Sequence, residues 1–225
     1  MDRDNKSDIA VLAQWFSAAR MKRYASASDP VALYVWNERL SKAYLEDVAH
    51  VEVLLRNFIA SRLATDCLRR CGDCAWYDHP GLYNLKEPFA HSVERVKGRL
   101  VHEGKTARYD GVIAGFSMDV WRFLLVKRLE PTVWRALRDQ RNGGMPHHPG
   151  TSRSDFESRV ATVYNLRNRC SHQEHLVMRD VGAESLRLDT FSNSLHWIAE
   201  HIDPDAAAWI DSMSRVAAVR LQRPR

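Results

Sequence analysis

The sequence predicts an all-α fold with one long amphipathic helix at its centre. Helix start signals recur, as at Asp29-Pro30 and Asp203-Pro204, where an N-capping aspartate stands before a proline. Strand-like alternation between Asn-Gly or Asp-Gly turns is sparse. Apolar residues instead recur at spacings of three and four, the repeat of a helix face. We therefore expect helices throughout.

Length and composition indicate one globular unit over residues 1–225. Hydrophobic residues make up 45% of the chain and charged residues 27%, as in ordinary folded domains. Residues 1–6 lack the apolar core of a signal peptide, and no run is long enough to cross a membrane. We expect a cytoplasmic protein with no membrane partner, in which the four cysteines are reduced thiols.

The net charge of +5 favours an acidic partner such as RNA. Most of the basic residues are arginines, whose planar side chains bind phosphate with two hydrogen bonds. An arginine-rich composition bias explains the same charge equally well, because dedicated nucleic-acid-binding domains are more basic.

The first predicted helix is capped by Ser7, carries Ile9 and Leu12 on one side, and ends near Ser26. The second begins at Asp29 and has the clearest periodicity in the chain. Unbroken to about Leu63, it would be about 50 Å long, enough to span the domain. Its apolar residues are expected along one face: Leu33, Trp36, Leu40, Tyr44, Val48, Val51, Leu55, Phe58 and Ile59.

Loops and further helices are expected to alternate after that. Loops are predicted at 71–85, 104–110 and 142–150, where glycine and proline interrupt the periodicity. Helices are predicted after Pro88, across the apolar residues 116–125, after Pro131, and in a C-terminal block at 184–221. Ser154 and Glu157 form a capping box that opens one more helix, which runs through Leu166.

That helix ends in the segment with the most candidate catalytic residues, Arg167 to Glu174. Arg167 and His172 are five residues apart, so on a regular helix they point about 140° apart. Either the helix ends at Ser171 or His172, or a two-fold dimer brings the motifs of two chains to one cleft. Asn168 is one turn before His172 and can hydrogen-bond the imidazole.

Histidine and arginine suit RNA cleavage without a metal ion. In that reaction the RNA 2′-hydroxyl attacks the adjacent phosphorus, so protons must move and charge builds up on phosphate. His172 would transfer a proton and Arg167 would hold the phosphate. The pair alone is a weak signal, because basic residues also favour any helix C-terminus.

Further motifs stand in order before this segment: Tyr34-Val35-Trp36-Asn37, Leu40-Ser41, Glu52 with Arg56-Asn57, and a central aromatic block with Trp121 and Trp134. With Arg167-Asn168 and His172 they resemble the Abi-like (abortive infection, AbiD/AbiF-like) family of the HEPN superfamily, over roughly residues 29–177. The resemblance implies a HEPN-like helical bundle that is often a homodimer. It also implies ribonuclease activity at Arg167 and His172, with Asn168 in support.

Three departures from the family pattern stand out. The central block 116–121 lacks a glycine, and Gln173 replaces a second histidine. In a related group of HEPN proteins that is controlled by modification, a tyrosine stands two residues after the histidine. Glu174 occupies that position here, which argues against control by modification in this protein. We assign Glu174 a supporting role.

Glu52 and Arg56 are four residues apart and can form an ordinary surface ion pair. The resemblance instead favours a functional role, with Arg56 or Asn57 near His172, where it orients the histidine or holds a phosphate.

No cofactor and no metal are predicted. Cys67, Cys71 and Cys74, followed by His79, are capable of binding zinc, but their spacing is irregular and reduced loop thiols are the favoured interpretation.

We therefore expect a homodimeric endoribonuclease of phage defence or of a toxin system, which an RNA or protein antitoxin controls. The alternative is a non-catalytic helical module that binds RNA or a protein partner.

Overall fold

The computed structural model describes residues 5–224, with side chains from residue 9, and all regular structure in that range is helical. The all-α prediction is confirmed. In chain order the α-helices are α1 (Asn5–Phe16), α2 (Ala18–Met21), α3 (Pro30–Cys71), α4 (Glu87–His102), α5 (Tyr109–Gly115), α6 (Met118–Phe123), α7 (Arg135–Arg138), α8 (Arg153–Ser171), α9 (Val181–Ile202), α10 (Pro204–Met213) and α11 (Val216–Arg220). Short 3-10 turns are η1 (Trp76–Asp78), η2 (Pro80–Tyr83), η3 (Lys127–Leu129) and η5 (Gln140–Asn142), and η4 (Glu130–Trp134) is a π-helix.

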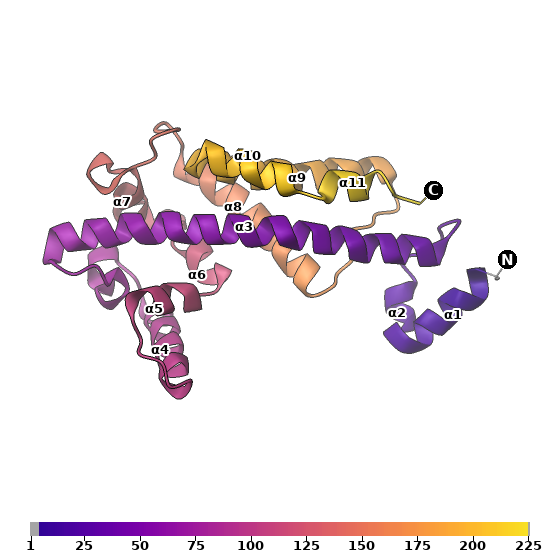
Figure 1. The fold of residues 1–225 in the computed structure, drawn as a ribbon, viewed down its shortest axis with the longest axis horizontal. Coiled ribbons are helices and arrows are strands. Elements are labelled where there is room, and N and C mark those ends of the chain that lie inside the picture. Colours follow the sequence, from indigo (N-terminus) through magenta and orange to yellow (C-terminus); the bar gives the residue numbers. More distant parts are fainter. Residues whose placement is uncertain (1–4, 225) are drawn as a thin grey trace.

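Helix α3 runs along the whole molecule (Figure 1). As predicted, Asp29 caps its first turn, and the carboxylate accepts a hydrogen bond from the Ala32 backbone N at 2.8 Å. The helix continues past the expected end near Leu63 and stops only at Gly72, whose φ of +78° ends it. At 42 residues it is about 63 Å long.

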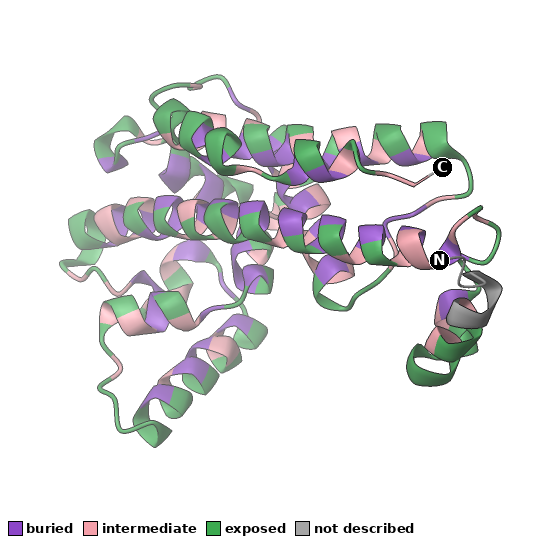
Figure 2. Ribbon diagram, turned by 45° about the vertical axis from the view of Figure 1, so that its right-hand side comes forward, coloured by how far each residue is buried: buried purple, intermediate pink, exposed green. Residues whose placement is uncertain are grey.

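Two groups of helices pack against α3. Helices α9, α10 and α11 lie along one side of it, and α4, α5 and α6 lie on the other (Figure 1). Helix α8 contacts both α3 and α9. Buried residues therefore occur on more than one side of α3 (Figure 2), and the single apolar face expected from the sequence is not confirmed.

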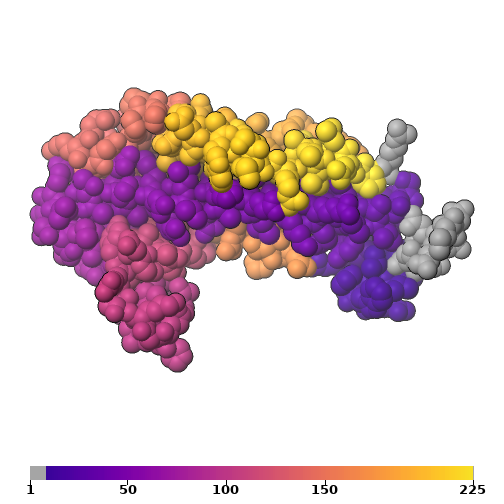
Figure 3. Space-filling view, in the orientation of Figure 1, coloured from indigo at the N-terminus to yellow at the C-terminus, as the bar shows by residue number. Residues whose placement is uncertain are grey.

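Helix α4 and the turn after it protrude from the body of the molecule (Figure 3). At its base an aromatic cluster anchors this arm to α3 and α6. The Trp76 ring lies 5.7 Å from the Phe89 ring and 6.2 Å from the Trp121 ring, measured between centroids. Both tryptophans are fully buried, so they belong to the core.

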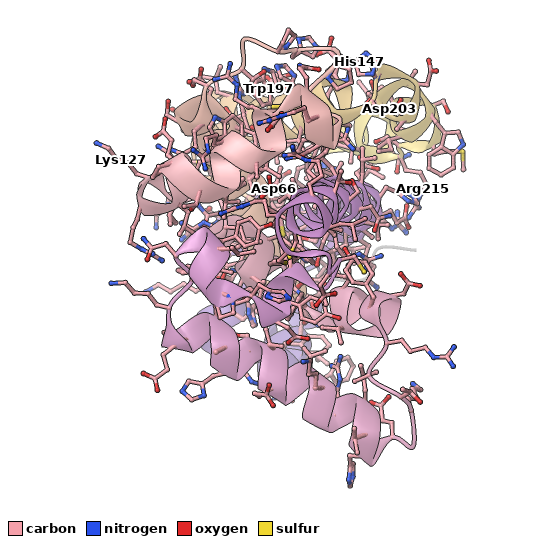
Figure 4. All side chains as sticks on the ribbon, turned by 90° about the vertical axis from the view of Figure 1, so that its left-hand side faces the viewer. Asp66, Lys127, His147, Trp197, Asp203 and Arg215 are labelled. Atoms are coloured by element: carbon pink, nitrogen blue, oxygen red, sulfur yellow. The ribbon has the colours of Figure 1, made fainter. Side chains whose placement is uncertain are left out.

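One buried carboxylate joins several loops to α3. Seen along α3 from its C-terminal end, Asp66 lies in the middle of the molecule (Figure 4). It accepts hydrogen bonds from the Tyr83 hydroxyl at 3.1 Å and from the Asn142 amide at 3.2 Å, and it pairs with Arg70. Asn142 stands where the predicted loop 142–150 begins, and this bond holds that end of the loop.

Besides the end of α3, three further helices differ from the prediction. The expected helix from Ser7 to Ser26 is two helices, because the φ of Ser17 is +77°, which no α-helix accommodates. The expected helix over 116–125 is shorter and begins at Met118 as α6, since Phe116 and Ser117 are both extended. Helix α8 is capped by Ser152 rather than Ser154, and Glu157 pairs with Arg153 instead of closing a capping box.

No helix among the described residues is both long and apolar enough to cross a membrane.

Candidate nucleic-acid interface

Helix α8 ends between the two residues proposed for catalysis. Its last residue is Ser171, and the backbone N of His172 donates to the Asn168 carbonyl at 2.9 Å. Gln173 then takes a φ of +53°, which turns the chain sharply. The helix end expected at Ser171 or His172 is therefore present, but Arg167 does not line the same pocket as His172.

The turn after α8 places His172 in a basic pocket of about 480 Å³. The other wall comes from α2 and the residues after it. Four permanently cationic side chains line the pocket against one carboxylate, that of Glu174. The lining residues with ionisable side chains are Arg20, Lys22, Arg23, Tyr24, His172, Glu174, His175 and Arg179.

Two arginines hold this turn in place. Nη1 of Arg20 donates to the Gln173 carbonyl at 3.0 Å. Arg169 donates to the His175 carbonyl at 3.3 Å, and its guanidinium lies 3.6 Å from a carboxylate oxygen of Glu174. The 172–175 turn is thus attached both to α8 and to the N-terminal segment.

A second histidine, His175, lines the same pocket, and its surroundings disfavour the protonated form. Burial, and after it the positive charges of Arg23 and Arg169, lower the pKa of His175 below its usual value. The lowered pKa favours the neutral imidazole, one of whose ring nitrogens can accept a hydrogen bond.

Arg167 lies in a different environment, with residues of α3 and α6. Burial raises the pKa of Glu52, while the nearby charges of Arg167 and Arg56 lower it and Asp119 raises it. Asp119 in turn accepts a hydrogen bond from the Tyr164 hydroxyl. Arg167 donates to the Asn168 side chain at 3.4 Å.

Within one chain the structure thus separates the predicted site residues into two groups. Glu174 lines the same pocket as His172, whereas Arg167 and Arg56 lie around Glu52. Among the described residues, neither arginine lines the His172 pocket. The Asn168 amide oxygen is bonded to Arg167 rather than to the imidazole.

Arg56 donates instead to its neighbour Asn57, at 3.3 Å. The position near His172 that the resemblance implies for Arg56 or Asn57 is therefore not seen within a single chain.

The sequence did not indicate five pocket residues: Arg20, Lys22, Arg23, His175 and Arg179. One signal was present, the basic run around Met21. The sequence does not show that this basic run lies beside His172, because α2 and the end of α8 are about 150 residues apart in the chain.

A larger cavity of about 650 Å³ lies between α3 and α7. Five arginines line it, but so do three carboxylates, and Asp66 and Asp139 pair with several of the arginines. The His172 pocket has the greater excess of positive charge and also contains the histidines.

No protein-family model, no curated protein and no solved structure matches this chain. The resemblance to Abi-like proteins, and the HEPN character of the bundle, therefore stay predictions made from the motif residues alone.

Proposed function

We propose that the protein is a metal-independent endoribonuclease that binds the RNA backbone in the His172 pocket. The observation that carries the proposal is the composition of this pocket, in which a histidine on the surface faces four cations and one carboxylate. An excess of arginine and lysine attracts phosphate, and the imidazole is the side chain that exchanges protons near neutral pH.

The reaction needs three groups. A base removes the proton of the RNA 2′-hydroxyl, which attacks phosphorus; an acid protonates the departing 5′-oxygen; and a cation stabilises the charge on the phosphoryl oxygens. His172 is assigned a proton transfer, and His175, which lines the same pocket, is a second imidazole available for proton exchange. Arg20 and Arg23 are suited to hold the phosphate.

Arg167 joins this site only if a second copy of the chain supplies it. A two-fold homodimer that brings the two α8 ends together would place Arg167 of one protomer near His172 of the other. The proposal therefore includes a homodimer, in keeping with the motif.

The mechanism has a direct chemical test. RNA should be cut in excess EDTA, whereas the same oligonucleotide with 2′-deoxyribose at the cleavage position should stay intact, because the attacking hydroxyl is missing. Circular dichroism in EDTA checks that the fold persists. Cleavage of the deoxy substrate at that position would refute the mechanism.

A non-catalytic RNA-binding module is the second candidate, and the separation of Arg167 from His172 within one chain favours it. In that case RNA length never changes. Replacing Lys22 with alanine should then weaken RNA binding. The plot of the logarithm of the association constant against the logarithm of the salt concentration should become less steep, by about 1. A gel of RNA before and after incubation separates the two candidates.

From the resemblance we extend the proposal to a role in phage defence or in a toxin system with an RNA or protein antitoxin. Expression of the chain should then arrest growth of a bacterial host, while the His172→Ala variant, expressed to the same level, should not. Equal growth with both proteins would contradict this role.

A further inference from the structure

The end of α3 opposite the His172 pocket gathers three metal-binding side chains. Cys67 and Cys71 are one turn apart in the last turns of α3, so their sulfurs lie on one face of the helix. The chain turns back after Gly72 and brings His79 beside them. One ligand atom from each of these three residues lies within 4.8 Å of the others.

The spacing of these atoms suits a tetrahedral ion. The Sγ atoms of Cys67 and Cys71 are 3.4 Å apart. Two thiolates on one zinc ion, each bonded at about 2.3 Å, stand about 3.8 Å apart, so a small side-chain rotation is sufficient. Thiolate and imidazole ligands select zinc over magnesium, calcium or manganese.

The histidine is already held in position. Its Nε2 is 2.8 Å from a carboxylate oxygen of Asp73, and the other oxygen of Asp73 accepts a hydrogen bond from the Ala75 backbone N at 2.9 Å. Among the described residues Nδ1 of His79 has no hydrogen-bond partner. A carboxylate on one ring nitrogen with the other nitrogen available is the usual arrangement of a zinc-bound histidine.

We propose that Cys67, Cys71 and His79 bind a zinc ion whose fourth position is open to solvent. Cys67 is buried and Cys71 is exposed, so the ion would sit at the surface with one side accessible. Bound zinc would attach the segment 72–79 to the end of α3. It would thereby stabilise the aromatic cluster around Trp76, at the base of the arm formed by α4. This differs from the metal-free protein expected from the sequence, which placed these thiols in a loop.

The zinc site does not depend on the proposed ribonuclease. It lies at the C-terminal end of α3, whereas the His172 pocket involves α2, beside the N-terminal part of the helix (Figure 1).

Metal content is the first test. The full chain, purified in a reducing buffer, is incubated with zinc sulfate, dialysed and analysed for zinc, and cobalt is used in parallel as a coloured substitute. We expect one ion per chain, a thiolate-to-cobalt charge-transfer band in the near ultraviolet, and a rise in Tm on adding zinc. Zinc content far below one ion per chain would overturn the proposal.

Matched variants then identify the ligands. Cys71→Ser and His79→Ala should each lose the ion and the charge-transfer band, and Asp73→Asn should weaken binding about 10- to 100-fold. Cys170→Ser, a buried thiol on α8, and Cys74→Ser, an exposed thiol next to the site, should retain it. Retention of zinc by Cys71→Ser, or its loss in Cys74→Ser, would contradict the proposed ligand set.

Discussion

Asp66 accepts hydrogen bonds from donors on three segments of the chain. Tyr83, Asn142 and the two arginines of the last turns of α3 all donate to its buried carboxylate. Without that carboxylate, buried donors would lose their acceptors, which costs more free energy than the bonds themselves contribute.

We therefore expect Asp66→Ala to lower the free energy of unfolding by about 1–3 kcal/mol. Urea denaturation measures the change. Glu94→Ala is the control, because Glu94 is exposed on α4 and should change stability by less than about 0.5 kcal/mol. Equal stability of the two variants would show that the Asp66 contacts contribute nothing.

We expect His201 to make the stability of the protein depend on pH. Its ring stacks between His148 and Trp197, with centroid distances of 3.8 Å and 3.4 Å. Burial, and after it the neighbouring His148, lower the pKa of His201. The unfolded chain thus takes up a proton near pH 6.5 that the folded protein does not, so stability falls as the pH drops below about 7.

Urea denaturation at pH 7.5 and pH 5.5 should show this loss in the wild type and a smaller loss in His201→Gln. His175, whose pKa is also lowered, contributes a dependence of the same sign, so part of the effect should remain in the variant. His91→Gln, an exposed histidine on α4, should behave as the wild type. An unchanged pH dependence in His201→Gln would refute the assignment.

At the scale of elements, the sequence predicted helix starts better than helix ends. Asp29-Pro30 begins α3 and Asp203-Pro204 begins α10, because a capping carboxylate and a proline are local signals. The predicted end of α3, near Leu63, is eight residues early, although Gly72 is a typical signal for a helix end. The break at Ser17 had no signal, since serine rarely adopts a positive φ.

Two glycine variants should have opposite effects. A Cβ at Gly72 meets no atom within 4 Å, yet φ there is +78°, so Gly72→Ala should cost about 1–2 kcal/mol from backbone strain alone. Gly98 lies inside α4, and a Cβ there also meets nothing within 4 Å, so Gly98→Ala should stabilise by about 0.5–1 kcal/mol. Thermal unfolding measures both, and effects of the same sign would contradict the account of the α3 terminus.

At the scale of the whole molecule, the candidate site could be predicted only in part. His172 and Glu174 were found because they are neighbours in the sequence. Arg20 and Arg23 were not predicted as site residues, because only tertiary folding brings α2 to the end of α8. The spacing of apolar residues in the sequence does not predict that contact. The distance of Arg167 from the pocket also follows from packing, since α8 turns that side chain toward α3.

A mixing experiment tests whether Arg167 and His172 act across two chains. Arg167→Ala and His172→Ala should each be inactive alone. If each site combines both protomers, a mixed dimer has one intact site, and an equal mixture should recover about a quarter of the wild-type rate. Recovery is measured after the two variants are mixed and allowed to exchange subunits. An inactive mixture would place both residues of a site in one chain, whereas full activity of Arg167→Ala alone would exclude Arg167.

Proton transfer by His172 during RNA cleavage is tested by the single-turnover cleavage rate of His172→Ala, measured beside that of His91→Ala. Both variants remove one exposed imidazole, but His91 lies on α4, outside the pocket. We expect a rate about 10²- to 10⁴-fold lower for His172→Ala and an unchanged rate for His91→Ala. Equal rates in the wild type and His172→Ala would contradict it.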